Sequence, residues 1–284
     1  MSHPIRTLVV GVASPDASDP ALVPAVALAR RLGAALHVVH AVAGVPARAL
    51  DEAVRVHARG VPVTCHVRKG PPAELLCQVA REVSAELLVL GATRGRRVWR
   101  QFLGSTVEAV VRCAPAPVLV VREPAAPAVR HVLLTPDLSP AGEELHERGL
   151  DVVKALFGGD DPELRALLAV QDAGLPPVLS RAMVERIAQR EIDRFLRERR
   201  PRGKAVQGRV RVGNPADEIL AEAAEWQAGL IVLGVYGCDG SAGLPLDRVT
   251  GTVLRRAGAS VLVVPAAAAP TDEPAAAVPL SVAG

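Results

Sequence analysis

The segment from residue 91 to residue 106 carries the residue types that bind phosphate groups in proteins. It reads GATRGRRVWRQFLGST, and its candidate ligands are Gly91, Arg94, Gly95, Gly104, Ser105 and Thr106. Glycine lets the backbone approach a ligand closely, and amide groups at the start of a helix attract anions. Arginine side chains add charged hydrogen bonds to phosphate oxygens. The sequence therefore predicts an anion site here, with a capped turn or a solvated basic loop as the alternatives.

A second polar segment, TPDLS at residues 135–139, follows an apolar run in the other half of the chain. The carboxylate of Asp137 could accept a hydrogen bond from a ribose or a base edge. The alternative is that Ser139 caps a helix begun by Pro140, with Asp137 a solvated loop residue. The corresponding residues 12–14 read VAS, so an acidic group is predicted to be absent there.

The two halves of the chain repeat each other. The matching pairs are the segments from Gly70 and Gly213, the apolar runs 118–121 and 261–264, and the openings 5–10 and 129–134. The first two pairs share one offset and the third has a smaller one. The second copy therefore carries an insertion between its first and third strands. We predict domains at 1–122 and 129–265, followed by a disordered Ala/Pro-rich tail at 266–284.

Apolar, β-branched runs alternate with helical patterns in each copy. In the first copy, strands are expected at 8–12, 36–42, 61–67, 87–90 and 118–121, and helices at 21–32, 48–58, 73–83 and 105–112. In the second copy, 140–157 and 181–199 are expected to be helices. Pro24 suggests that the first helix begins there, and Gly33 is expected to end it.

This alternation predicts an α/β fold of two tandem doubly wound domains. Each would be an open, mostly parallel five-stranded sheet with helices on both faces. In such sheets, ligands bind beyond the carboxyl ends of the strands, where the strand order switches. Both polar segments follow predicted strands, so both are expected at such an edge.

The first copy resembles the universal stress protein family. Family members that bind ATP carry Gly, two residues, Gly, nine residues and then Gly-Ser or Gly-Thr. This copy matches the pattern at Gly91, Gly104 and Ser105. It departs at the middle glycine, where Arg94 stands instead and Gly95 follows one place late.

The second copy resembles the same family at other positions. It matches at Gly234 and Gly237 but has Asp247 and Arg248 in place of Gly-Ser. The family places an aspartate at the end of the first strand, where it contacts the nucleoside, and Asp137 matches that residue. Each copy thus keeps a different part of the family's binding pattern.

The resemblance implies a stress-response protein that binds ATP or another adenine nucleotide, with or without magnesium. It would act as a ligand-biased sensor or regulator, with at most slow ATP hydrolysis. Its last strands would pair within the chain as a pseudo-dimer, and a homodimer and an unidentified protein partner are further expectations. The alternative is a nucleotide-free tandem scaffold for protein–protein interaction with degenerate pockets.

Composition argues against other classes of function. A formal net charge of +3 and an aromatic content of 2% do not favour nucleic acid as a partner. Apolar runs are too short to span a membrane, and a cytoplasmic location is expected. The four cysteines, Cys65, Cys77, Cys113 and Cys238, show no CxxC spacing and are predicted to be reduced and buried. No HExxH motif, P-loop lysine or GxGxxG motif occurs in the sequence.

Overall fold

The computed structural model describes eleven segments, which carry the helices and strands. These are residues 5–13, 19–41, 50–52, 54, 57–92, 105–122, 129–158, 162–172, 180–199, 206–236 and 246–266. The elements of domain 1 are β1 (Thr7–Val12), α1 (Leu22–Leu32), β2 (Ala35–His40), β3 (Val63–Val67), α3 (Pro72–Glu82), β4 (Leu87–Ala92), α4 (Ser105–Cys113) and β5 (Val118–Arg122). Those of domain 2 are β6 (His131–Thr135), α5 (Pro140–Phe157), β7 (Glu163–Gln171), α6 (Arg181–Glu198), β8 (Val206–Gly213), α7 (Pro215–Glu225), β9 (Leu230–Val235), α8 (Arg248–Arg256) and β10 (Ser260–Pro265).

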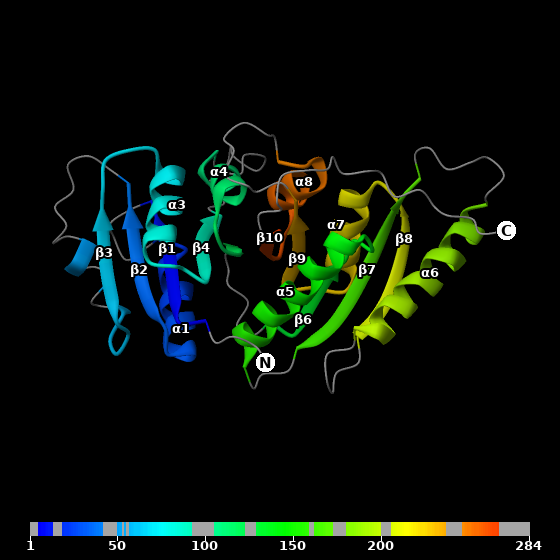
Figure 1. Ribbon diagram of the computed structural model, residues 1–284, viewed down its shortest axis with the longest axis horizontal. Helices are drawn as coiled ribbons and strands as arrows, with labels where there is room; N and C mark the ends of the chain where they lie inside the picture. The colour runs from blue at the N-terminus through cyan, green and yellow to red at the C-terminus, as the bar shows by residue number, and fades with distance from the viewer. Residues whose placement is uncertain are drawn as a thin grey trace.

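A ten-stranded sheet runs through both domains (Figure 1). Its strand order is β3-β2-β1-β4-β5-β10-β9-β6-β7-β8. Strands within each domain are parallel, whereas β5 and β10 are antiparallel, with Leu119 opposite Leu262. The predicted pairing of the two last strands is therefore confirmed. In each domain, the strand order reverses direction between the first and fourth strands, which places the ligand-binding edge there.

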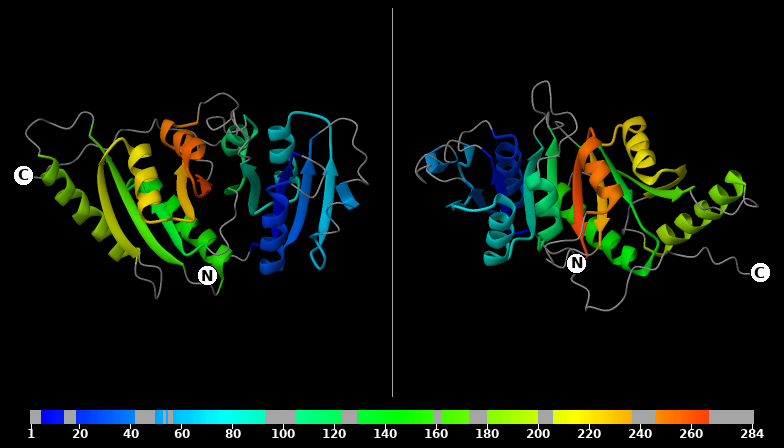
Figure 2. Two further views of the ribbon diagram at one scale, coloured as in Figure 1. Left: turned by 180° about the vertical axis from the view of Figure 1, so that it is seen from behind. Right: turned by 90° about the horizontal axis from the view of Figure 1, so that it is seen from above.

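Helices lie on both sides of this sheet, as the α/β prediction requires (Figure 2). Alternate residues of one strand enter different cores: Leu8 and Val10 pack with α1, whereas Val9 packs with α3 and α4. Strands that are buried on both faces need apolar residues at nearly every position. This requirement explains the continuous apolar runs in the sequence. Each core also contains residues from both domains, so the hydrophobic layers on the two faces of the sheet continue from one domain to the other.

Proline and glycine set the ends of α1. The helix begins at Leu22, one residue after the start of the expected range 21–32 and two before Pro24, which therefore lies in its first turn. Backbone amides in a first turn lack a partner within the helix, so proline causes no loss there. Gly33 ends the helix in a left-handed conformation with φ of 64°, as predicted.

The insertion in the second copy is distributed over several elements. α5 has 18 residues where α1 has 11, and β7 has nine where β2 has six. α6 adds another 18-residue helix at the outer side of domain 2 (Figure 1). The predicted helices at 140–157 and 181–199 are confirmed to within one residue.

Cys77 and Cys113 form a disulfide, contrary to the prediction that the cysteines are reduced. Cys77 lies in α3, and Cys113 is the last residue of α4. The two cysteines are 36 residues apart in the sequence, and this spacing does not indicate that they lie close together. Cys65 is half-buried in β3 and lies outside this disulfide, and Cys238 lies outside the described residues.

Side chains next to the β5–β10 seam also join the domains. Arg255 of α8 forms an ion pair of 2.8 Å with Glu108 of α4. Arg31 of α1 donates a hydrogen bond to the carbonyl of Leu156, near the end of α5, and lies 5.9 Å from the ring centre of Phe157. Cations stabilise the carbonyl end of a helix, so Arg31 ties α1 to α5. Among the helices in the described segments, none is long and apolar enough to span a bilayer.

Candidate functional site

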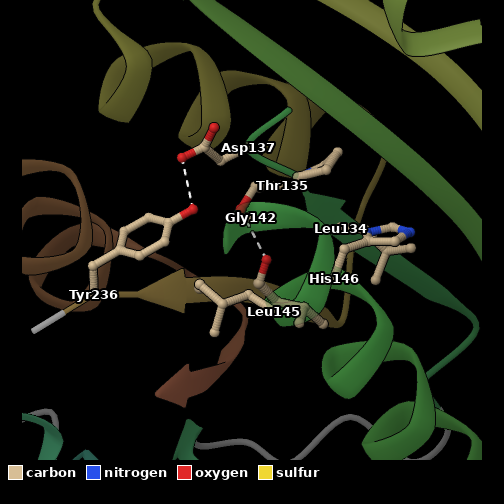
Figure 3. A pocket seen from close by; sticks show the side chains of 10 residues that line it. Leu134, Thr135, Asp137, Gly142, Leu145, His146 and Tyr236 are labelled. Atoms are coloured by element: carbon tan, nitrogen blue, oxygen red, sulfur yellow. Dashed lines mark hydrogen bonds between the residues drawn. The ribbon is translucent and has the colours of Figure 1, made fainter. Parts of the chain in front are cut away.

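A hollow opens at the carboxyl ends of β6 and β9, where the strand order of domain 2 reverses (Figure 3). Its cavity volume is about 40 Å³, and it is open to solvent. Leu134, Leu145 and Val232 form apolar walls, and Asp137 and His146 are among its polar groups. A few polar groups in a largely apolar concavity are typical of small-molecule sites.

Asp137, Ser139 and Tyr236 form a hydrogen-bonded cluster at this hollow, and Figure 3 shows the bond between Tyr236 and Asp137. The Tyr236 hydroxyl donates to the Asp137 carboxylate at 2.7 Å and lies 3.2 Å from the Ser139 hydroxyl. The Ser139 amide donates to the other Asp137 oxygen at 2.9 Å. Partial burial and the negative charge of Asp137 together raise the pKa of Tyr236, so the phenol is protonated at neutral pH.

Ser139 also caps α5, because its hydroxyl oxygen accepts from the amide of Gly142 at 3.1 Å. The capping interpretation of Ser139 is therefore confirmed. Asp137 is an exposed loop residue, as the alternative interpretation has it, and both of its carboxylate oxygens accept hydrogen bonds. A side chain on Gly142 would collide with the carbonyl oxygen of Asp137, so this glycine allows the loop to close over the start of α5.

His146 of α5 places a buried imidazole beside the cluster. Its side chain is 7% exposed, and its Nε2 atom has no hydrogen-bond partner. The ring packs edge-on against Phe195, with ring centres 4.9 Å apart. Burial, together with the positive charge of Arg199, lowers the pKa of His146 to about 4. The imidazole is therefore neutral at pH 7.

Two of the glycines predicted to approach phosphate, Gly91 and Gly234, lie in close packing contacts. Gly234 lies within β9, where a Cβ atom would meet Leu145 Cδ1 at 2.8 Å. Gly91 lies within β4, where a Cβ atom would meet Pro20 Cγ at 2.9 Å. Both glycines therefore let a helix or its leading loop lie against the sheet. Of the remaining predicted glycines, Gly237 lies outside the described residues.

The start of α8 differs from a phosphate site. Asp247 is its N-cap and accepts a hydrogen bond from the amide of Thr250 at 2.8 Å. A carboxylate therefore occupies the position where the family pattern has Gly-Ser. In domain 1, Ser105 and Thr106 begin α4. The predicted phosphate ligands before them, Arg94, Gly95 and Gly104, lie outside the described residues.

An acidic group does lie at the end of β1, so the prediction of its absence is wrong. Asp19 is 5% exposed, and its carboxylate accepts from the amides of Ala13 at 2.7 Å and Ala21 at 2.9 Å. The signal that could have found it is an aspartate two residues before a helix. Nearby, His40 is buried, with Nδ1 3.0 Å from the Val12 carbonyl oxygen and Nε2 without a partner.

The described residues hold no group of three or more His, Cys, Asp or Glu side chains placed to bind a metal ion. The two edges together supply carboxylates, hydroxyls and imidazoles. These groups suit recognition of a polar organic ligand.

Comparison with known proteins gives a consistent family. The model of the universal stress protein family matches residues 46–122 and 128–265. A universal stress protein of Mycolicibacterium smegmatis is 32% identical over 219 residues, which cover 72% of this chain and 69% of that protein. One from Mycobacterium tuberculosis is 28% identical, over 68% of this chain and 65% of that protein. The chain thus matches about two thirds of the length of these relatives.

Solved structures share the fold of the whole chain. A protein of unknown function from Pseudomonas aeruginosa superposes with a TM-score of 0.75 at 17% identity, over 93% of each chain. A universal stress protein from Archaeoglobus fulgidus gives a TM-score of 0.66, also at 17% identity, over 91% of this chain and 98% of that one. Two family matches in tandem, together with these likenesses, leave one conclusion: the chain belongs to the universal stress protein family.

Proposed function

We propose that this protein binds ATP or another adenine nucleotide and acts as a ligand-biased regulator in a stress response. The observation that carries the proposal is the hollow at the strand-order switch of domain 2. There, the exposed carboxylate of Asp137 lies beside apolar walls. A carboxylate can accept ribose hydroxyls, and an apolar wall can pack against a base.

The residues of the hollow fit a nucleoside better than a triphosphate. Asp247 sets a negative charge at the start of α8, and its side chain already bonds the Thr250 amide. Phosphate oxygens would be repelled by this carboxylate and would have to compete with it for the helix amides. In domain 1, the start of α4 at Ser105 has no such acidic cap in the family position. We infer that triphosphate contacts are stronger in domain 1.

Regulation would follow from differential binding to conformations rather than from chemistry. A ligand in the hollow would contact the start of α5, whose other end is held by Arg31 of α1. A shift of α5 would therefore change the contact between domains. Differential affinity of tenfold between two arrangements corresponds to about 1.4 kcal/mol, which is enough to redistribute their populations.

A second candidate, the nucleotide-free scaffold, is favoured by one observation. The side chains of Asp137, Ser139 and Tyr236 already form hydrogen bonds within their own cluster. The Asp247 carboxylate already accepts a hydrogen bond from an amide of its own helix. A site that is internally satisfied gains less from a ligand, because each new hydrogen bond replaces an existing one. A scaffold of this kind would bind a protein partner through its surface and would not bind nucleotide.

Calorimetric titration and thermal unfolding with ATP, each with and without magnesium, separate the two candidates. Binding at a concentration of 100 Kd would stabilise the protein by about 2.7 kcal/mol. Asp137→Asn should weaken binding in domain 2, and Gly104→Asp/Ser105→Arg, which copies the second repeat into the first, should weaken it in domain 1. Absence of binding and of stabilisation at millimolar ATP would establish the scaffold instead.

A further inference from the structure

We infer that Tyr236 is an internal occupant of the hollow, which a ligand with two neighbouring hydroxyl groups must displace. The inference rests on the proposed nucleotide function and specifies how domain 2 recognises the nucleotide. Tyr236 follows directly on β9, and its hydroxyl points at Asp137 across the hollow (Figure 3). It therefore holds the carboxylate that a ribose would need.

The hydroxyl of Tyr236 imitates a ligand hydroxyl in its hydrogen bonds. Its single proton goes to Asp137, at 2.7 Å, so the Ser139 hydroxyl is left to donate to the phenol oxygen, at 3.2 Å. Ser139 at the same time accepts from the amide of Gly142. One donor to a carboxylate and one acceptor for a serine hydroxyl are what the 2′ and 3′ hydroxyls of a ribose can offer together.

The phenol can leave without unfolding the domain. Its side chain is 42% exposed, and it lies at the end of β9 rather than within the strand. Asp137 is held independently by the Ser139 amide at 2.9 Å, so its carboxylate keeps its place when the phenol moves. Rotation of one exposed side chain would therefore open the contact, and the buried walls of the hollow would stay as they are.

The contact between the Tyr236 phenol and the Asp137 carboxylate belongs to domain 2. By the constant offset of the repeat, Thr93 stands where Tyr236 stands in the second copy, so the first copy has no phenol to place at its edge. The acidic group of domain 1, Asp19, is instead held by the backbone amides of Ala13 and Ala21. The contact between a phenol and a carboxylate therefore belongs to the second copy.

The experiment uses Tyr236 as its own reporter, since it is the only tyrosine in the chain. The full-length protein is labelled with ¹³C at tyrosine Cζ, which yields one resonance, and is titrated with ATP. We expect the resonance to move on addition of ATP and to move less with 2′-deoxy-ATP, which offers one hydroxyl of the pair. The same titrations by calorimetry should show that Tyr236→Phe binds ATP about tenfold more tightly, because no charged hydrogen bond has to be broken.

The outcomes separate this inference from the proposed function. If wild type binds ATP but the Tyr236 resonance does not move, or if Tyr236→Phe binds equally or more weakly, the inference is overturned and nucleotide binding stands. If neither wild type nor Tyr236→Phe binds ATP, both fail together. Asp137→Asn is the matched control: its tyrosine resonance in the absence of ligand should differ from wild type and should resemble the displaced state.

Discussion

Lowering the pH should destabilise this protein through His146. In the folded protein, burial lowers the pKa of its imidazole from 6.5 to about 4, whereas the unfolded chain leaves the group in water with its ordinary value. Above pH 6.5, both states are neutral and the group has no effect. Between pH 6.5 and 4, the unfolded state binds a proton that the folded state does not. The free energy of unfolding therefore decreases as the pH is lowered through this range.

The size of the effect follows from the pKa difference. At pH 5, the unfolded state gains about 2 kcal/mol from protonation that the folded state lacks, since each pKa unit corresponds to about 1.36 kcal/mol. The measurement is the free energy of unfolding in urea at pH 7, 6 and 5, for wild type and for His146→Leu. Carboxylates titrate in both proteins, so the difference between the two curves isolates His146. A difference that stays constant from pH 7 to 5 would show that His146 is not a buried neutral group.

Three further changes test other parts of the structure. The Cys77–Cys113 disulfide closes a loop with a sequence separation of 36, and its reduction should lower the free energy of unfolding by about 4 kcal/mol. Urea titrations with and without reductant measure this difference. The variant Cys77→Ala/Cys113→Ala should not respond to reductant. The variant Asp247→Gly/Arg248→Ser restores the family pattern in domain 2 and should bind ATP about tenfold more tightly in calorimetry. Loss of the Asp247 cap should lower the free energy of unfolding by a few tenths of a kcal/mol. An unchanged affinity for ATP would contradict the assignment of Asp247 as an obstacle to phosphate. Arg31→Ala should lower the free energy of unfolding by about 1 kcal/mol, because it removes a cation from the carbonyl end of α5, and a value near zero in urea would show that this contact between domains is not stabilising.

The fold could be predicted from the sequence because it depends on patterns that persist over many residues. Runs such as 87–90 are apolar at every position, and strands of that kind must be buried on both faces. The repeat then indicated two domains, and the resemblance to the universal stress protein family implied that their last strands, in the runs 118–121 and 261–264, would pair. A change of one residue in such a pattern would leave the prediction intact.

The site could be predicted only in part, because it depends on single hydrogen bonds. Asp137 and Ser139 were found, since they directly follow a strand and precede a helix. Tyr236 was missed: sequence spacing does not show which of several loop residues will place a hydroxyl 2.7 Å from a carboxylate. Asp19 was missed because its carboxylate reaches back to Ala13 through a loop whose path the sequence does not specify.

The two edges differ most in what holds their carboxylates, and this difference bears on which of them responds to a ligand. Both oxygens of Asp19 accept from backbone amides, which cannot move without displacing β1 or α1. One oxygen of Asp137 accepts instead from an exposed phenol, which can turn away at the cost of one hydrogen bond. A ligand hydroxyl can thus exchange with the partner of Asp137 far more readily than with those of Asp19. The sequence motifs favoured domain 1 as the nucleotide site because it keeps more of the phosphate pattern. The hydrogen bonds instead favour the sheet edge of domain 2 as the place where nucleoside binding would be coupled to a conformational response.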